Sequence, residues 1–94
     1  MEYLIAFTST SQAIRAERLL MDAKLKIRVM PLPGQINVGC GICLRVEAEE
    51  LEEALRILQS RLIGGIEVYQ KTLEGKRIIY LPHPITTQED ESTG

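Results

Sequence analysis

The sequence predicts an α+β fold in which two helices cover one face of an antiparallel sheet. Three observations support this prediction. Two segments, 10–23 and 49–62, carry apolar residues at helical spacing. Short runs rich in β-formers stand before, between and after them. The chain has 94 residues and an apolar content of 45%, with one Phe and no Trp, so a single small domain must form around an aliphatic core.

The first half of the chain is expected to form a strand, a helix and a second strand. Glu2–Phe7 alternates its apolar side chains as strands do. Ser9 and Gln12 fit a capping box, which starts a helix running from about Thr10–Ala23. Lys26–Pro33 is expected to be the second strand, and its two prolines should end the pairing with a neighbour.

The second half supplies a loop, a strand, a helix and a hairpin. These segments are expected in the order Gly34–Gly41, Ile42–Ala48, Glu49–Leu62, Ile66–Thr72 and Arg77–Pro82. Acidic residues in the first turn suit the dipole of the second helix, and Gly64 follows as a stop signal. The order β-α-β-β-α-β with an extra C-terminal edge strand predicts a ferredoxin-like sandwich. This domain would occupy residues 1–82, and the acidic stretch 83–94 is expected to be disordered.

Charge and hydropathy argue against several classes of partner. The net charge is -2, with both signs interspersed, so no basic field is available to hold nucleic acid. The longest uncharged run, Val29–Leu44, is interrupted by prolines and glycines and cannot span a membrane. The N-terminal stretch is too short and too acidic for a signal peptide. We therefore expect a cytoplasmic protein that binds neither nucleic acid nor membranes.

The stretch NVGCGICLRV holds both cysteines, Cys40 and Cys43, at the entrance to a predicted strand. A C-x-x-C pair can cycle with a disulfide, ligate a soft metal, or act as nucleophile and resolving group. In a regular strand the two side chains point to opposite faces, so a disulfide would need an irregular turn at Gly41. On such a strand, Cys43 is most simply a packing residue. Cys40 lies between Gly39 and Gly41 with little core to fill, which makes it the better candidate for a functional thiol.

Neither a cofactor nor a metal is expected. One C-x-x-C supplies two ligands where zinc usually has four, and the single histidine, His83, stands beside the acidic C-terminal stretch. The glycines of the loop 34–41 do not form a nucleotide-binding pattern. The carboxylates around the start of the second helix are expected to be solvated and to offset the helix dipole, not to act as an acid and base pair.

Three stretches resemble a small bacterial family described as selenium/sulfur carrier-like: YLIAFTSTSQAIRAERLL, IRVMPLPGQINVGCGICLRV and EELEEALRIL. The most specific element is a Cys-Gly pair followed by a short apolar-Leu-Arg strand, here Cys40-Gly41 and then Ile42, Cys43, Leu44 and Arg45. The family name rests on a distant likeness to TusA-type sulfur carriers, which hold a Cys-Pro motif at the start of the first helix. This chain has Ser and Thr at that place. Its thiols come after the second strand, and Cys43 stands where relatives are expected to have a small apolar residue. The resemblance therefore points to Cys40, with Cys43 as an accessory.

The resemblance implies a carrier that needs no cofactor. A sulfur donor such as a cysteine desulfurase would load Cys40 with a persulfide, and an acceptor protein would unload it. Gly39 and Gly41 would shape the loop, and Arg45 would stabilise the anion. Whether the chain is itself an enzyme stays open. The alternative is a non-catalytic interaction or ligand-sensing module in which the cysteines are structural.

A homodimer is also expected. Alternation along the predicted strands places Leu4, Ala6, Met30 and Cys43 on the sheet face opposite the helices. An apolar face left bare in water is unfavourable, and two copies that stack these faces, or join along the Arg77–Leu81 edge, would cover it. The competing expectation is that the C-terminal hairpin folds across this face within one chain.

Overall fold

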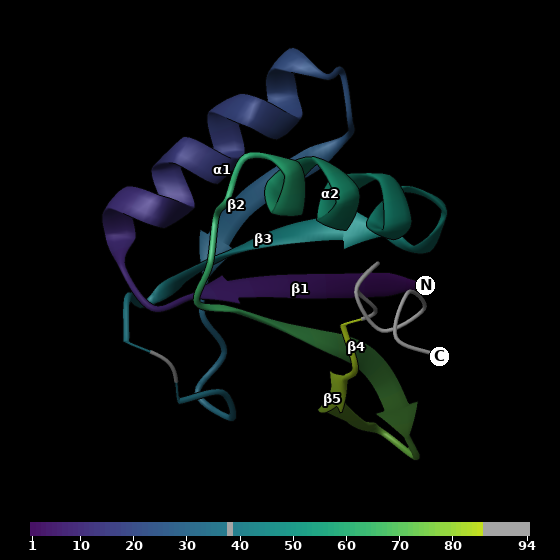
Figure 1. Cartoon of the computed structure of the whole chain (residues 1–94). Coiled ribbons are helices and arrows are strands. Elements are labelled where there is room, and N and C mark those ends of the chain that lie inside the picture. The colour runs from purple at the N-terminus through teal and green to yellow at the C-terminus, as the bar shows by residue number, and fades with distance from the viewer. Residues whose placement is uncertain (38, 86–94) are drawn as a thin grey trace, which may run out of the picture.

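The computed structural model describes residues 1–37 and 39–85 and confirms an α+β fold with two helices and a five-stranded antiparallel sheet (Figure 1). The elements run in the order β1 Glu2–Phe7, α1 Thr10–Asp22, β2 Ile27–Pro31, β3 Ile42–Glu47, α2 Ala48–Ser60, β4 Ile66–Glu74 and β5 Arg77–His83. Each predicted element is present. The differences lie at the ends, where β2 is shorter than expected and β4 and β5 are longer.

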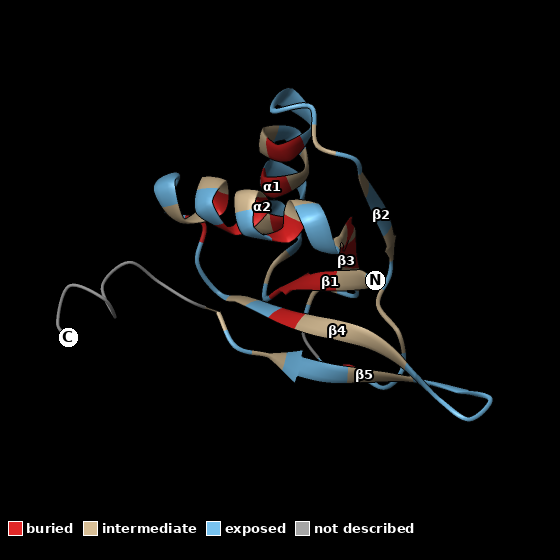
Figure 2. Ribbon diagram, turned by 90° about the vertical axis from the view of Figure 1, so that its right-hand side faces the viewer, coloured by how far each residue is buried: buried red, intermediate tan, exposed pale blue. Residues whose placement is uncertain are grey.

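β1 is the central strand of the sheet. The strands lie in the order β2-β3-β1-β4-β5, and every neighbouring pair is antiparallel. Ile5 on β1 pairs with Leu44 on one side and Val68 on the other. α1 joins β1 to β2 past β3, and α2 joins β3 to β4 past β1. Both helices therefore lie on one face of the sheet (Figures 1 and 2).

β2 is an edge strand that contains Pro31. Pro31 pairs with Ile42, and the next residue, Leu32, donates its N–H to the Gly41 carbonyl oxygen at 3.0 Å. Hydrogen-bonded pairs alternate in an antiparallel ladder, so Pro31 and Ile42 form a pair without mutual backbone hydrogen bonds. The missing N–H of Pro31 faces the open edge, where no donor is needed. β2 and its ladder end at this pair, as the prolines predict, and the Leu32 N–H adds one further hydrogen bond beyond it.

α1 begins where its capping pattern predicts. Ser9 is extended, and its Oγ accepts a hydrogen bond from the Gln12 N–H at 3.3 Å. The buried stripe of the helix consists of Ala13, Ala16 and Leu20. Two alanines in this stripe allow the helix axis to approach the sheet closely.

Both helices end on a left-handed residue that is not glycine: Lys24 has φ 67° and Leu62 has φ 61°. After α2, the Leu62 and Ile63 N–H groups donate back into the last turn, and the bond from Ile63 to the Leu58 carbonyl is 2.9 Å long. This is the hydrogen-bond pattern of a Schellman motif. Ile63 is buried, which offsets the cost of the left-handed leucine. The predicted stop at Gly64 is thus wrong by two residues.

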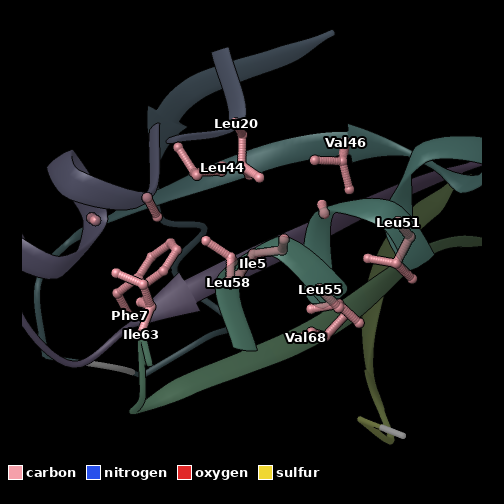
Figure 3. Packing of buried hydrophobic residues seen from close by; sticks show 13 residues of the cluster. Ile5, Phe7, Leu20, Leu44, Val46, Leu51, Leu55, Leu58, Ile63 and Val68 are labelled. Carbon is pink, nitrogen blue, oxygen red and sulfur yellow. The ribbon is translucent and has the colours of Figure 1, made fainter. Parts of the chain in front are cut away.

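The main core lies between the helices and the sheet (Figure 3). We call this cluster the helix-side core. Its buried members are Ile5, Phe7, Ala13, Ala16, Leu20, Leu44, Val46, Leu51, Ala54, Leu55, Leu58, Ile63 and Val68. The aliphatic character expected from the composition is confirmed, with Phe7 as the one aromatic ring among these buried members.

The sheet face opposite the helices holds a second, smaller core. Leu4, Ala6 and Cys43 are at most 1% exposed, and Ile36 joins them at 5%. Partly buried residues pack around them, namely Met30, Leu32, Tyr69 and Tyr80. The prediction of a bare apolar face is therefore wrong, because the chain covers this face itself.

The cover is the connection between β2 and β3, described at residues 32–37 and 39–41, which we call the covering loop. It runs on the side of the sheet away from the helices (Figure 1). Ile36 inserts into the small core. Gln35 donates from Nε2 to the Ile78 carbonyl oxygen at 2.8 Å, which ties the loop to β5. The C-terminal hairpin alone does not supply the cover. Because the face is already covered, it no longer gives a reason to expect a dimer through it.

The described chain continues past β5. The His83 ring meets the Tyr3 ring edge-on, with centroids 4.9 Å apart. Ile85 packs against the helix-side core. Residues 83–85 thus associate with the domain, and the rest of the stretch predicted to be disordered, 86–94, lies outside the described residues. Within 1–37 and 39–85, no helix is long and apolar enough to cross a membrane.

Candidate thiol site

The connection into β3 lies at the same end of the sheet as the connections from β1 to α1 and from α2 to β4 (Figure 1). Cys40 belongs to this connection, two residues before β3 begins. The Thr8 N–H donates to the Gly65 carbonyl oxygen at 3.1 Å, which joins the other two connections. A Cβ on Gly39 would lie 3.0 Å from the Thr8 carbonyl oxygen. Gly39 is therefore needed for close approach, and it holds the residue before Cys40 against the start of α1.

Gly41 has a different role. Its φ is 81°, in the left-handed region, and nothing lies within 4 Å of a Cβ built there. The requirement is therefore conformational and not steric. This irregular residue sits between Cys40 and the first residue of β3, so the chain turns sharply just before the strand begins. Both glycines act as the sequence predicts, in that each shapes the loop around Cys40.

The two thiols occupy opposite faces of the sheet. Cys40 is partly exposed, packs against the helix-side core, and its Sγ–H donates to the Ile42 carbonyl oxygen at 3.2 Å. Cys43 has no exposed surface and belongs to the small core on the other face. Both cysteines are free. The thiols thus lie on opposite faces, as expected, although Cys40 precedes β3 and the irregular Gly41 stands between them.

Cys43 is chemically protected in this fold. Burial, with a contribution from the charge of Cys40, raises its pKa from 9.0 to about 11. At neutral pH only roughly one Cys43 in ten thousand would be a thiolate, the form that reacts. Its Sγ is 3.9 Å from the Pro31 carbonyl oxygen, a weak contact. Cys40 is thus the accessible thiol of the pair.

Arg45 does not approach Cys40. It extends from the face opposite the helices and pairs through Nη2 with Glu2 at 2.7 Å and Glu47 at 3.3 Å. Arg45 lies three positions into β3, about 10 Å along the strand from Ile42, and on the opposite face of the sheet from Cys40. The structure therefore does not bring together Cys40 and the arginine expected to support its anion. Arg28, the other cation near in sequence, pairs in register with Arg45 on that same face.

A cleft of about 560 Å³ lies away from the thiols, between α2 and the end of β5. Tyr3, Glu52, Arg56 and His83 are among its lining residues. Sequence reasoning missed it, because the contact of Tyr3 with His83 joins the two ends of the described chain and has no local signature. In the part of the chain that the structure describes, no group of three or more His, Cys, Asp or Glu could hold a metal ion.

The family model described as "Putative Se/S carrier protein-like" matches residues 2–70, which include β1 through most of β4 and both cysteines. No curated protein and no solved structure matches this chain. The matched region contains all of the site described above.

Proposed function

Because the chain belongs to the Se/S carrier protein-like family, we propose that it carries sulfur or selenium as a persulfide or its selenium analogue on Cys40. The observation that carries the proposal is the contrast between the two thiols. Cys40 is partly exposed on a glycine-flanked loop, whereas Cys43 is fully buried with its pKa raised to about 11. A carrier needs one accessible thiol, and Cys40 meets this condition.

The loading step balances without an added oxidant. The Cys40 sulfur attacks the outer sulfur of a donor persulfide, such as that of a cysteine desulfurase. The donor S–S bond breaks, the donor cysteine leaves as a thiolate, and it takes up the proton that Cys40 gives up. Unloading is the same step toward an acceptor protein. A selenium atom in place of the outer sulfur leaves the balance unchanged.

Access to Cys40 requires a small local change. Its Sγ–H is bonded to the Ile42 carbonyl oxygen and part of the side chain packs on the helix-side core. A donor must therefore draw the thiol out of this contact. Gly41 has open space around its α-carbon, so the backbone beside Cys40 can adjust without a clash. Gly39 keeps the other side of the loop fixed against Thr8.

Three further assignments accompany this proposal. The strand order and the two helix crossings support a ferredoxin-like sheet extended by β5. Free thiols in a C-x-x-C pair suit the reducing cytoplasm. A homodimer remains a prediction, and with the small core covered it would have to form through an open sheet edge such as β2 or β5.

The test is loading of single-cysteine variants by a cysteine desulfurase with cysteine, followed by intact-mass measurement. Wild type and Cys43→Ala should each gain the mass of one sulfur atom, and Cys40→Ser should gain none. Reduction with a dithiol should remove the added mass. Loading of Cys40→Ser to the wild-type extent, or no loading of wild type, would refute the proposal.

A second candidate function is a non-catalytic interaction module with structural cysteines. The bond from Cys40 to the Ile42 carbonyl and its packing on the core favour this alternative. It predicts that no thiol accepts sulfur and that Cys40→Ala lowers the free energy of unfolding by more than about 1 kcal/mol. The carrier proposal predicts a smaller loss, because a thiol that must swing outward contributes little to the fold.

A further inference from the structure

Charged side chains cover the half of the sheet face that the covering loop leaves open. On β1, β3 and β4 they form one network: Glu2 accepts from Arg45 at 2.7 Å and from Lys71 at 3.2 Å, and Glu47 lies 3.3 Å from Arg45. Arg28 on β2 pairs in register with Arg45. This end of the face is distant from Cys40, and the proposed carrier function makes no use of it.

This charged half has a positive surplus. Its cations are the side chains of Lys26, Arg28, Arg45 and Lys71 and the Met1 amino group, which lies 3.9 Å from Glu47. Its carboxylates are Glu2, Glu47 and Glu50, the last of which accepts from the Lys26 N–H at 3.0 Å, so the sum is 5 − 3 = +2 in a chain of net charge -2. Among the described residues, the side chains of Lys26 and Arg28 make no ion pair. Like charges directly opposite each other on a sheet are destabilising. Arg45 is paired with Glu2 and Glu47, so within the described residues it is Arg28, directly opposite, that lacks a counter-ion.

A depression of about 220 Å³ lies at this surplus, lined by Lys26, Ile27, Arg28, Arg45 and Glu47. A water molecule occupies about 30 Å³ of liquid, so a single tetrahedral oxyanion with some of its water fits. Arg45 still has hydrogen-bond capacity, since both carboxylates contact Nη2 and the buried Nε has no partner among the described residues.

We propose that Lys26, Arg28 and Arg45 bind a phosphate group that retains one O–H. The two arginines and the lysine supply charge-assisted donors to the phosphate oxygens. Glu47 stands at the wall of the depression as an acceptor only, and it repels a fully deprotonated oxyanion. A phosphate that keeps one proton turns this repulsion into a hydrogen bond. The site therefore prefers protonated phosphate to sulfate.

The probe is inorganic phosphate, titrated into ¹⁵N-labelled full chain at about pH 6, where phosphate groups retain a proton. Saturable shifts are expected at the amides of residues 26–28 and 45–47. Arg28→Gln should bind roughly tenfold more weakly, because one charge-assisted contact is lost. Arg77→Gln, at an exposed arginine on β5, is the matched control and should bind as wild type does.

A parallel titration with methyl phosphate compares the affinity for a phosphomonoester with that for inorganic phosphate. Binding of either supports the site, and the ligand that binds more tightly indicates which of the two the site takes. Non-saturating shifts, equal affinity in Arg28→Gln, or equal weakening in Arg77→Gln would overturn it. Sulfate binding as tightly as phosphate would overturn the role of Glu47. A spectrum of free Arg28→Gln first verifies its fold, and Lys26→Gln repeats the test at a second residue.

Discussion

Replacing Ile36 with alanine tests whether the covering loop shields the small core. Ile36 is 5% exposed and packs with Leu4, Ala6 and Cys43. Truncating a buried isoleucine to alanine costs about 2–5 kcal/mol, and a loop can settle into part of the space, so we expect about 2 kcal/mol. Urea unfolding measures this loss directly. If the covering loop opens locally, a loss of about 2 kcal/mol raises the fraction of molecules with an open loop by about thirtyfold. The rate at which Cys43 is alkylated in the native protein should rise by the same factor.

The matched control is Leu73→Ala, at a leucine that is 72% exposed on β4, and it should change the free energy of unfolding by less than about 0.5 kcal/mol. The reasoning is refuted if Ile36→Ala costs no more than this control and leaves Cys43 labelling unchanged. That result would mean that the covering loop does not seal the face, and it would restore the case for a second chain upon it.

Three further predictions concern the helix end, the buried thiol and the charged network. Leu62→Gly should stabilise the protein by about 0.5–1 kcal/mol in urea unfolding, because Leu62 is 88% exposed and has φ 61°. A loss of stability would show that the leucine side chain supports the helix end. The pKa of Cys43 is raised to about 11 by burial, so stability should be complete below pH 9.0 and fall as the pH rises toward about 11. Cys43→Ala should lack this alkaline loss, and an equal loss in the variant would contradict the assignment. Burial alone would raise the pKa of Glu2, but the hydrogen bond from Lys71 and the charges of Arg45 and Lys71 outweigh it and lower the pKa below 4.5. Glu2→Gln should therefore cost up to about 1 kcal/mol at neutral pH, and the difference from wild type should vanish as the pH falls below that range.

Local patterns were enough to predict most of the fold. Ser9 and Gln12 marked the start of α1, and the apolar stripes of both helices and the alternation in β1 and β3 gave the layers. These signals work because capping and side-chain period are properties of adjacent residues. The helix ends were harder to predict, since Leu62 adopts a left-handed conformation that suits glycine, and its support comes from the cap hydrogen bonds and the burial of Ile63.

The candidate site was predictable in part. Alternation already placed Arg45 on the same face as Cys43, so its separation from Cys40 could have been read from the sequence. The partner Glu2 could not, because the register of β1 on β3 is a long-range property. The covering loop was also hidden, since Ile36 is a lone apolar residue among polar and glycine neighbours, and its burial depends on contacts with β1 and β3.

The most direct measurement of the central claim is the position of the transferred sulfur in wild-type protein. After loading by a desulfurase and alkylation, trypsin cleavage at Arg28 and Arg45 leaves both thiols in the peptide 29–45. Fragmentation between Gly41 and Ile42 then separates Cys40 from Cys43. The account predicts that the added sulfur is found in the fragment containing Cys40 and that the fragment containing Cys43 carries none. Sulfur found on Cys43, or divided equally between the two, would contradict it.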